Sequence, residues 1–219
     1  MQRDIIAKLN AWKASEYRKP LILKGARQVG KTWALKEFGR TSYLNFVYLT
    51  LEEPSPGVQS EYAQFFEGTR DPRRIISNLS LALGQPIEPG ETLLIDEIQD
   101  CPSAVGALKY FCDEAPEYHV ACAGSLLGVR LSRETSAFPV GKVEFMEMRP
   151  MSFSEFLKAE GAANYDEYLG GLDQIETVPD FFHVRLVEHL RRYFACGGMP
   201  EALGRWVETG DIVQVDKVL

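Results

Sequence analysis

Residues 25–32 read Gly-Ala-Arg-Gln-Val-Gly-Lys-Thr and match the motif G-x-x-x-x-G-K-[ST] at every specified position. Glycines in such a loop permit backbone angles closed to other residues, so successive N–H groups can turn toward an anion. The apolar run Leu21 to Leu23 predicts a buried strand before the loop, and Lys31 to Phe38 predicts a helix that stops at Gly39. Because a helix N-terminus adds a positive dipole end, this context predicts a nucleoside triphosphate site.

The polar residues of this loop have separate expected roles. Lys31 would reach the β- and γ-phosphates, and the Thr32 hydroxyl would bind Mg²⁺. Arg27 is interpreted as a solvated loop residue, with contact to phosphate or to a neighbouring subunit as the alternative. The predicted nucleotide-binding residues are Gly25, Ala26, Arg27, Gln28, Val29, Gly30, Lys31, Thr32 and Trp33.

A second motif lies at the end of another predicted strand, where residues 93–97 read Leu-Leu-Ile-Asp-Glu. An acid at the carboxyl end of a buried strand beside the loop can hold Mg²⁺, usually through water, and this assigns Asp96 to the metal. Glu97 can polarise the attacking water as a general base, which favours hydrolysis over phosphoryl transfer to a small acceptor. The alternative is an ordinary solvated turn.

Ser125 is the third catalytic candidate, with Lys31 and Glu97. It follows the predicted strand 119–123, where ATPases with an extra strand between the two motif-bearing strands place a polar residue that senses the γ-phosphate. Ser125 could equally cap a helix that starts at Leu126, and both roles can hold. The sequence does not choose among the candidates for an arginine finger or lid arginine, which are Arg130, Arg133, Arg149, Arg191, Arg192 and Arg205.

Strands alternate with helices over the first 149 residues and predict an α/β three-layer sandwich with a parallel sheet. The predicted strands are 21–23, 43–51, 92–95, 119–123 and 142–148, and the helices between them include 58–67, 72–83 and 102–114. A helix is also predicted at the start, where Ile5, Leu9 and Trp12 share one face.

After Pro150 the pattern becomes helical. Ser152 and Glu155 predict a capping box for a helix over 152–159. Residues 180–195 predict a longer helix with one face formed by Leu186, Leu190, Tyr193 and Phe194. Further helices are predicted over 201–207 and 211–219. We therefore expect a core over 1–149 and a lid-like helical region over 150–219, truncated at its C-terminus because Leu219 lies in an apolar-periodic run without a stop signal.

Composition limits the classes of function. The 219 residues carry a net charge of −7, which argues against this piece binding nucleic acid directly on its own. No apolar run is long enough to span a membrane, and no secretory signal is apparent. The four cysteines form no CxxC pair and lack histidines at ligand spacing, so free thiols in the cytoplasm fit better than zinc or disulfides.

The combined motifs resemble those of predicted prokaryotic AAA+-like ATPases near the STAND and archaeal-type branch. The segments that carry the resemblance are 19–32, 93–99, 123–128, 149–157 and 193–202. The resemblance implies a P-loop NTPase sheet in the order 5-1-4-3-2, with Lys31 and Thr32 in Walker A, Asp96 and Glu97 in Walker B, and Ser125 as sensor. It also implies a further C-terminal domain, absent here, of unknown function and similar to restriction-endonuclease folds. No second-region arginine of the AAA+ kind stands out, which leaves the lid's role and oligomer assembly open.

Four functions remain open at this point. The first is a Mg²⁺-dependent ATPase (a hydrolase converting ATP to ADP and phosphate) whose cycle drives an attached effector domain or an unknown protein partner. The second is a slow nucleotide-gated switch. The third is a component of a DNA-processing or defence system, and the fourth is a small-molecule kinase, which the Asp96-Glu97 pair disfavours.

Overall fold

The computed structural model describes residues 2–124, 138–172 and 177–218. The chain divides into two compact units. The larger unit comprises Ile5–Arg27 and Lys31–Met148, and the smaller comprises Met1–Asp4, Gln28–Gly30 and Arg149–Leu219. No helix in the described part of the chain is long and apolar enough to cross a lipid bilayer.

The larger unit is built on a five-stranded sheet in which all neighbouring strands are parallel. The strands are β1 (Leu21–Lys24), β2 (Phe46–Thr50), β3 (Thr92–Asp96), β4 (His119–Gly124) and β5 (Glu144–Glu147). Their order across the sheet is β2-β3-β4-β1-β5. This confirms the predicted order 5-1-4-3-2, and it places β4 between the two strands that carry the motifs.

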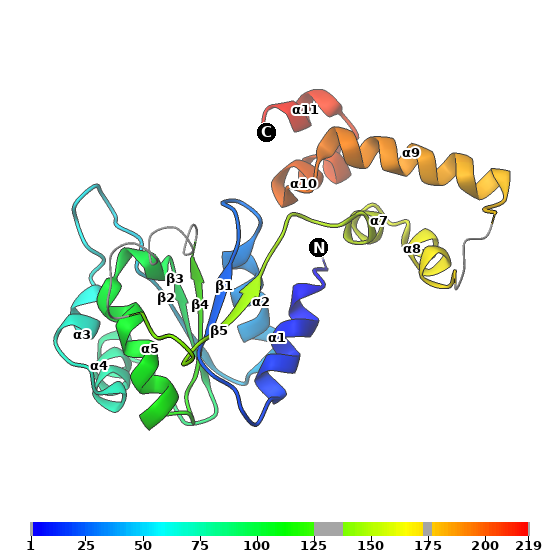
Figure 1. Ribbon diagram of the computed structural model, residues 1–219. Helices are drawn as coiled ribbons and strands as arrows, with labels where there is room; N and C mark the ends of the chain where they lie inside the picture. The colour runs from blue at the N-terminus through cyan, green and yellow to red at the C-terminus, as the bar shows by residue number, and fades with distance from the viewer. Residues whose placement is uncertain (1, 125–137, 173–176, 219) are drawn as a thin grey trace. The chain divides into compact units, whose positions relative to one another are not determined.

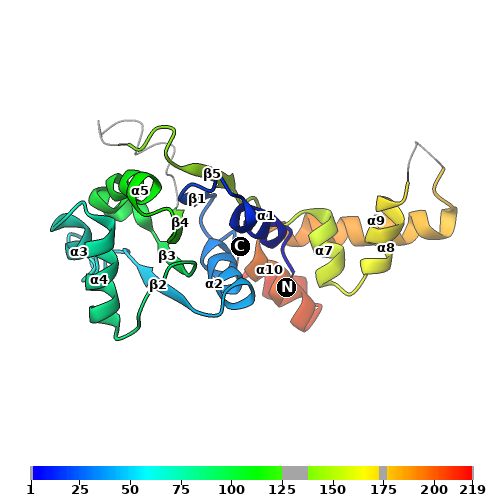
Figure 2. The ribbon, with the colours of Figure 1, turned by 90° about the horizontal axis from the view of Figure 1, so that it is seen from below.

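Helices cover both faces of this sheet (Figures 1 and 2). One face carries α1 (Ile5–Ala14) and α2 (Lys31–Ser42), and the other carries α3 (Ala63–Glu67), α4 (Pro72–Leu83) and α5 (Pro102–Glu114). All five residues of β3 are buried, as are the first three of β1. Strands covered on both faces need such continuous apolar runs. The predicted three-layer sandwich is therefore confirmed.

Helix α2 runs through Gly39 to Ser42, so the predicted stop at Gly39 was wrong. A Cβ atom at Gly39 would lie 2.7 Å from ring atoms of Phe46 and 2.9 Å from Leu94 Cδ1. The glycine therefore allows the helix to lie close against β2 and β3, and it does not end the helix.

Tyr43 was predicted to begin the second strand but lies before it, in a cluster of rings. Its ring meets the Phe38 ring edge-on at a centroid distance of 5.4 Å. Its hydroxyl lies 2.8 Å from Nδ1 of His119, the first residue of β4. Burial lowers the pKa of His119 to about 4, and the positive charges of Arg18 and Lys13 add to this effect. The imidazole is therefore neutral at neutral pH.

The smaller unit is helical. Its helices are α7 (Phe153–Ala159), α8 (Ala163–Gly170), α9 (Asp180–Cys196), α10 (Pro200–Thr209) and α11 (Ile212–Asp216). The predicted capping box is present, because Ser152 Oγ accepts from the Glu155 N–H at 3.2 Å and Glu155 Oε2 accepts from the Ser152 N–H at 2.9 Å. Helix α8 was not predicted, since none of its residues is buried and no apolar face marks it.

A buried ion pair connects three segments of the smaller unit. Arg3 is 5% exposed, and its Nε donates to Glu155 Oε1 at 2.9 Å. The other guanidinium nitrogens donate to the carbonyls of Val29 at 2.8 Å and Arg149 at 2.7 Å. Burial alone would raise the pKa of Glu155, but hydrogen bonds from Ser152, Asp4 and Arg3 outweigh it and lower the pKa. This pair therefore fixes the chain at the start of α7.

The predicted apolar face of α9 is only partly covered. Leu186, Leu190 and Tyr193 are partly buried, whereas Phe194 is 74% exposed. Tyr193 also donates a hydrogen bond to the carbonyl of Met151 at 2.8 Å, which ties α9 to the segment before α7.

Candidate functional site

The loop predicted to bind phosphate connects β1 to α2, as its motif requires. Gly30 has a φ of 92°, a left-handed conformation that favours glycine. At the earlier bend the left-handed residue is Gln28, with a φ of 63°, and not Gly25. Helix α2 then begins at Lys31, so its N-terminus follows directly from the loop.

Lys31 is 6% exposed, and its side chain folds back on the loop. Its Nζ donates to the carbonyl oxygens of Gly25 at 3.0 Å and Ala26 at 2.7 Å. Burial lowers the pKa of Lys31, while the negative charges of Glu97 and Asp96 act in the opposite direction. The ammonium is thus held at the phosphate loop and close to the acidic pair.

The structure brings Thr32 and Asp96 together, although 64 residues separate them in the chain. Thr32 Oγ1 donates to Asp96 Oδ2 at 2.6 Å. Asp96 is the last residue of β3 and is 4% exposed, and its Oδ1 accepts from the N–H of Glu97 at 3.0 Å. A hydroxyl and a carboxylate in contact beside a phosphate loop are oxygen ligands of the kind that Mg²⁺ takes.

These residues fit Mg²⁺ bound in the manner of nucleotide-dependent enzymes. Within the described residues no three His, Cys, Asp or Glu side chains cluster as a metal cage would need. Mg²⁺ is commonly held by one or two carboxylates together with substrate phosphates and waters, so one carboxylate and one hydroxyl suffice.

Glu97 follows β3 directly in a left-handed backbone conformation, with a φ of 48°. Non-glycine residues rarely adopt such angles, and the residues that do adopt them are often found at functional sites. The Gln99 side-chain amide donates to Glu97 Oε2. The Gln99 Oε1 atom is buried and has no hydrogen-bond partner in the part of the chain that the structure describes.

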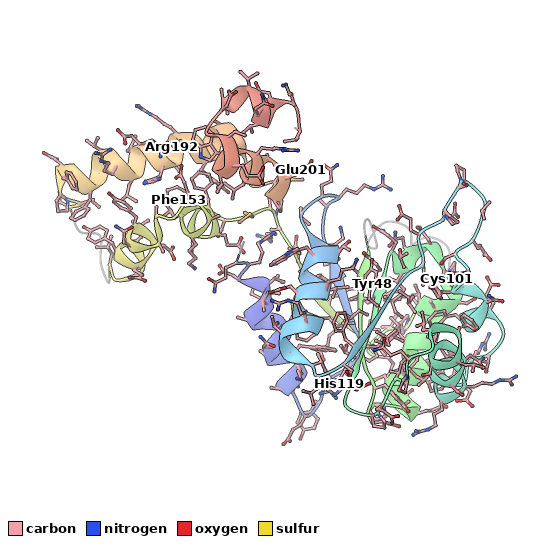
Figure 3. The ribbon with its side chains drawn as sticks, turned by 180° about the vertical axis from the view of Figure 1, so that it is seen from behind. Tyr48, Cys101, His119, Phe153, Arg192 and Glu201 are labelled. Carbon is pink, nitrogen blue, oxygen red and sulfur yellow. The ribbon has the colours of Figure 1, made fainter. Side chains whose placement is uncertain are left out.

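Sequence reasoning missed two residues that contact the acidic pair, Gln99 and Tyr48. Tyr48 lies on β2 (labelled in Figure 3), and its hydroxyl donates to Asp96 Oδ2 at 3.0 Å. The register pairs Thr50 with Asp96, so Tyr48 lies two residues earlier on the neighbouring strand. The predicted strand order placed the second strand beside the third and so pointed to side chains of β2, but the register that selects Tyr48 is not apparent from the sequence.

Arg27 and Trp33 were also predicted to contact nucleotide. Arg27 is exposed, and Trp33 is 41% exposed on α2. Trp33 lines a shallow groove of about 320 Å³ between α2 and β2, together with Lys36, Phe46 and Tyr48. Ser125 lies outside the described residues.

The candidate arginines fall into different surroundings. Arg192 forms an ion pair with Glu160 at 3.1 Å, and Arg205 forms one with Glu208 at 3.6 Å, both inside the smaller unit. Arg191 is exposed on α9, and the carbonyl of Arg149 accepts from Arg3. Arg130 and Arg133 lie outside the described residues.

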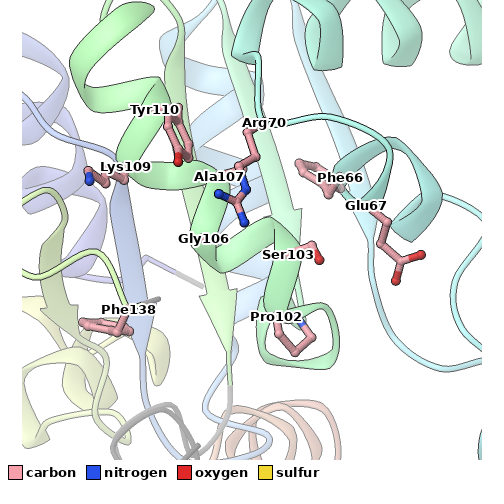
Figure 4. A pocket seen from close by; sticks show the side chains of 10 residues that line it. All are labelled: Phe66, Glu67, Arg70, Pro102, Ser103, Gly106, Ala107, Lys109, Tyr110 and Phe138. Carbon is pink, nitrogen blue, oxygen red and sulfur yellow. The ribbon is translucent and has the colours of Figure 1, made fainter. Parts of the chain in front are cut away.

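A larger pocket of about 520 Å³ lies between α3 and α5 (Figure 4). Phe66, Arg70 and Tyr110 line this pocket. Gly106 also lines it, and a Cβ atom there would point into open space, with nothing within 4 Å. Its described lining contains none of the residues predicted to bind nucleotide.

Fold and site together define a class of protein. The sheet is parallel with β4 between β1 and β3, the phosphate-loop motif joins β1 to α2, and an acidic pair follows from the end of β3. These features are those of a P-loop NTPase of the additional-strand type.

The family follows from comparison with known proteins. A family model described as an AAA domain matches residues 17–157, and the chain belongs to this family. Membership supports nucleotide binding and hydrolysis in general. Comparison with curated proteins found no similar sequence.

Solved structures are similar at low sequence identity, and the one with a TM-score above 0.5 shares the fold. The structure of C. elegans PCH-2 is similar with a TM-score of 0.52 and 11% identity, over 98% of this chain and 67% of that one. AMPPCP-bound DnaA from Aquifex aeolicus gives a TM-score of 0.42 and 14% identity, over 92% of this chain and 62% of that one. A mutant of RuvB from Thermotoga maritima gives a TM-score of 0.47 and 15% identity, over 87% of this chain and 70% of that one.

Proposed function

We propose that this protein binds ATP with Mg²⁺ at Gly25–Thr32 and hydrolyses it to ADP and phosphate. The observation that carries the proposal is the 2.6 Å hydrogen bond between Thr32 Oγ1 and Asp96 Oδ2, which unites the two motifs. Mg²⁺, held by these two residues, would neutralise charge on the β- and γ-phosphate oxygens.

The chain's own residues divide the work of hydrolysis. Lys31 exchanges its bonds to the Gly25 and Ala26 carbonyls for bonds to phosphate oxygens. Glu97 accepts a proton from a water whose oxygen attacks the γ-phosphorus, and the bond from that phosphorus to the bridging oxygen breaks as ADP leaves. We further propose that the cycle changes the conformation of an attached or partner domain, with 1–149 as the catalytic core and 150–219 as a lid-like region.

Phosphate release from the purified protein tests the assignment of Glu97. We expect Glu97→Gln to slow release by about 100-fold or more, because the amide cannot take the proton, while a fluorescent ATP analogue still binds. A Glu97→Gln variant that releases phosphate as fast as the parent would show that the base is misassigned.

A slow nucleotide-gated switch is the second candidate, and the bond from Gln99 to Glu97 favours it, since this bond occupies the base. Gln99→Leu separates the two functions. If Gln99 orients Glu97 for hydrolysis, the variant releases phosphate several-fold more slowly than the parent. If Gln99 holds Glu97 away from water, the variant is faster.

A further inference from the structure

Tyr48 shares one carboxylate oxygen with the proposed Mg²⁺ site. Its hydroxyl donates to Asp96 Oδ2 at 3.0 Å, and Thr32 Oγ1 donates to the same atom at 2.6 Å. The other oxygen, Oδ1, accepts from the backbone N–H of Glu97 at 3.0 Å. Three donors from β2, α2 and the residue after β3 therefore fix the plane of the Asp96 carboxylate.

Contacts on its ring hold Tyr48 in place. Lys36 Nζ lies 4.0 Å from the ring centroid, a cation–π contact made by the next turn of α2 after Thr32. A phenol carries its proton at physiological pH, so the Tyr48 hydroxyl acts as the donor toward the carboxylate.

Asp96 needs such support because a carboxylate accepts a metal only in a limited range of orientations. Hydrogen-bond partners of metal-binding groups set that orientation, and their loss commonly lowers metal affinity by about 10- to 100-fold. We propose that Tyr48 is a positioning residue whose phenol orients Asp96 toward Mg²⁺ bound with nucleotide. The inference rests on the proposed function of the same site.

Tyr48→Phe tests this role because it removes the hydroxyl and keeps the ring under Lys36. Binding of a fluorescent ATP analogue is titrated with Mg²⁺, and the affinity is also measured in EDTA. We expect the Mg²⁺ concentration at half-maximal binding to rise about 10-fold in the variant, with no change in the metal-free affinity.

Tyr43→Phe is the matched control. It removes a phenol that is hydrogen-bonded to His119, at the end of the sheet opposite the site, and we expect the Mg²⁺ midpoint of the parent. A buried tyrosine that contributes only packing would weaken binding equally with and without Mg²⁺.

Each result is decisive. An unchanged midpoint in Tyr48→Phe, or equal weakening in Mg²⁺ and in EDTA, overturns the positioning role and leaves the proposed function standing. A parent protein that shows no Mg²⁺-dependent binding of the analogue overturns both. A raised midpoint in Tyr48→Phe, with parent behaviour in Tyr43→Phe, supports the inference.

Discussion

At the residue scale, the Asp96 carboxylate is where the sequence-predicted chemistry and the unpredicted contacts meet. Thr32 and Glu97 were expected beside it from the two motifs, and both donate to it. Tyr48 was not expected, because its contribution depends on the register between β2 and β3, which the spacing of residues along the chain does not encode.

His119 makes the stability of the fold depend on pH. Its pKa falls from 6.5 in the unfolded chain to about 4 in the fold, so the unfolded state binds more protons between these values. The contribution of His119 to the free energy of unfolding is fully present above pH 6.5 and is lost as the pH falls toward 4. The total loss is about 2 kcal/mol once solvent screening of the partly buried ring is allowed for. We expect His119→Gln to remove this contribution.

Urea unfolding at about pH 7.5 and about pH 4.5 measures the effect. The parent should lose more free energy of unfolding than His119→Gln between the two pH values. Equal losses would show that the imidazole is not buried as a neutral base.

At the scale of elements, two glycines inside helices have opposite surroundings. A Cβ at Gly39 in α2 would lie 2.7 Å from Phe46, whereas one at Gly106 in α5 would meet nothing within 4 Å. Overpacking costs about 1–3 kcal/mol, and alanine improves helix propensity by about 1 kcal/mol. We expect Gly39→Ala to be destabilising by about 1 kcal/mol and Gly106→Ala to be stabilising by a similar amount.

Thermal unfolding of the two alanine variants checks this pair, and each serves as the control for the other. Variants that shift the melting temperature in the same direction would contradict the described packing of α2 against β2.

Element type was largely predictable because apolar patterns mark buried faces. Strands β1 to β4 and most helices follow such runs, and Pro102 and Ser152 mark helix starts correctly. Two predictions failed where local patterns do not decide the structure. Gly39 was predicted to end α2, but it allows close packing against β2 and β3. Helix α8 was not predicted because it has no buried residue to produce an apolar pattern.

At the scale of the whole molecule, the order of the strands followed from the family resemblance, and the parallel pairings confirm it. The resemblance could not supply contacts that depend on three-dimensional detail. Two such contacts are the hydrogen bond from Gln99 to Glu97 and the buried ion pair of Arg3 with Glu155, which no sequence motif predicts.

Binding of a fluorescent ATP analogue with Mg²⁺ to the parent and to Lys31→Ala tests the central claim most directly. Lys8→Ala, which removes an exposed lysine of α1, is the control. We predict binding that is about 10- to 100-fold weaker in Lys31→Ala, because a charge-assisted bond to phosphate is lost, and parent-like binding in Lys8→Ala. Equal affinity in the parent and Lys31→Ala would contradict a nucleotide site at Gly25–Thr32.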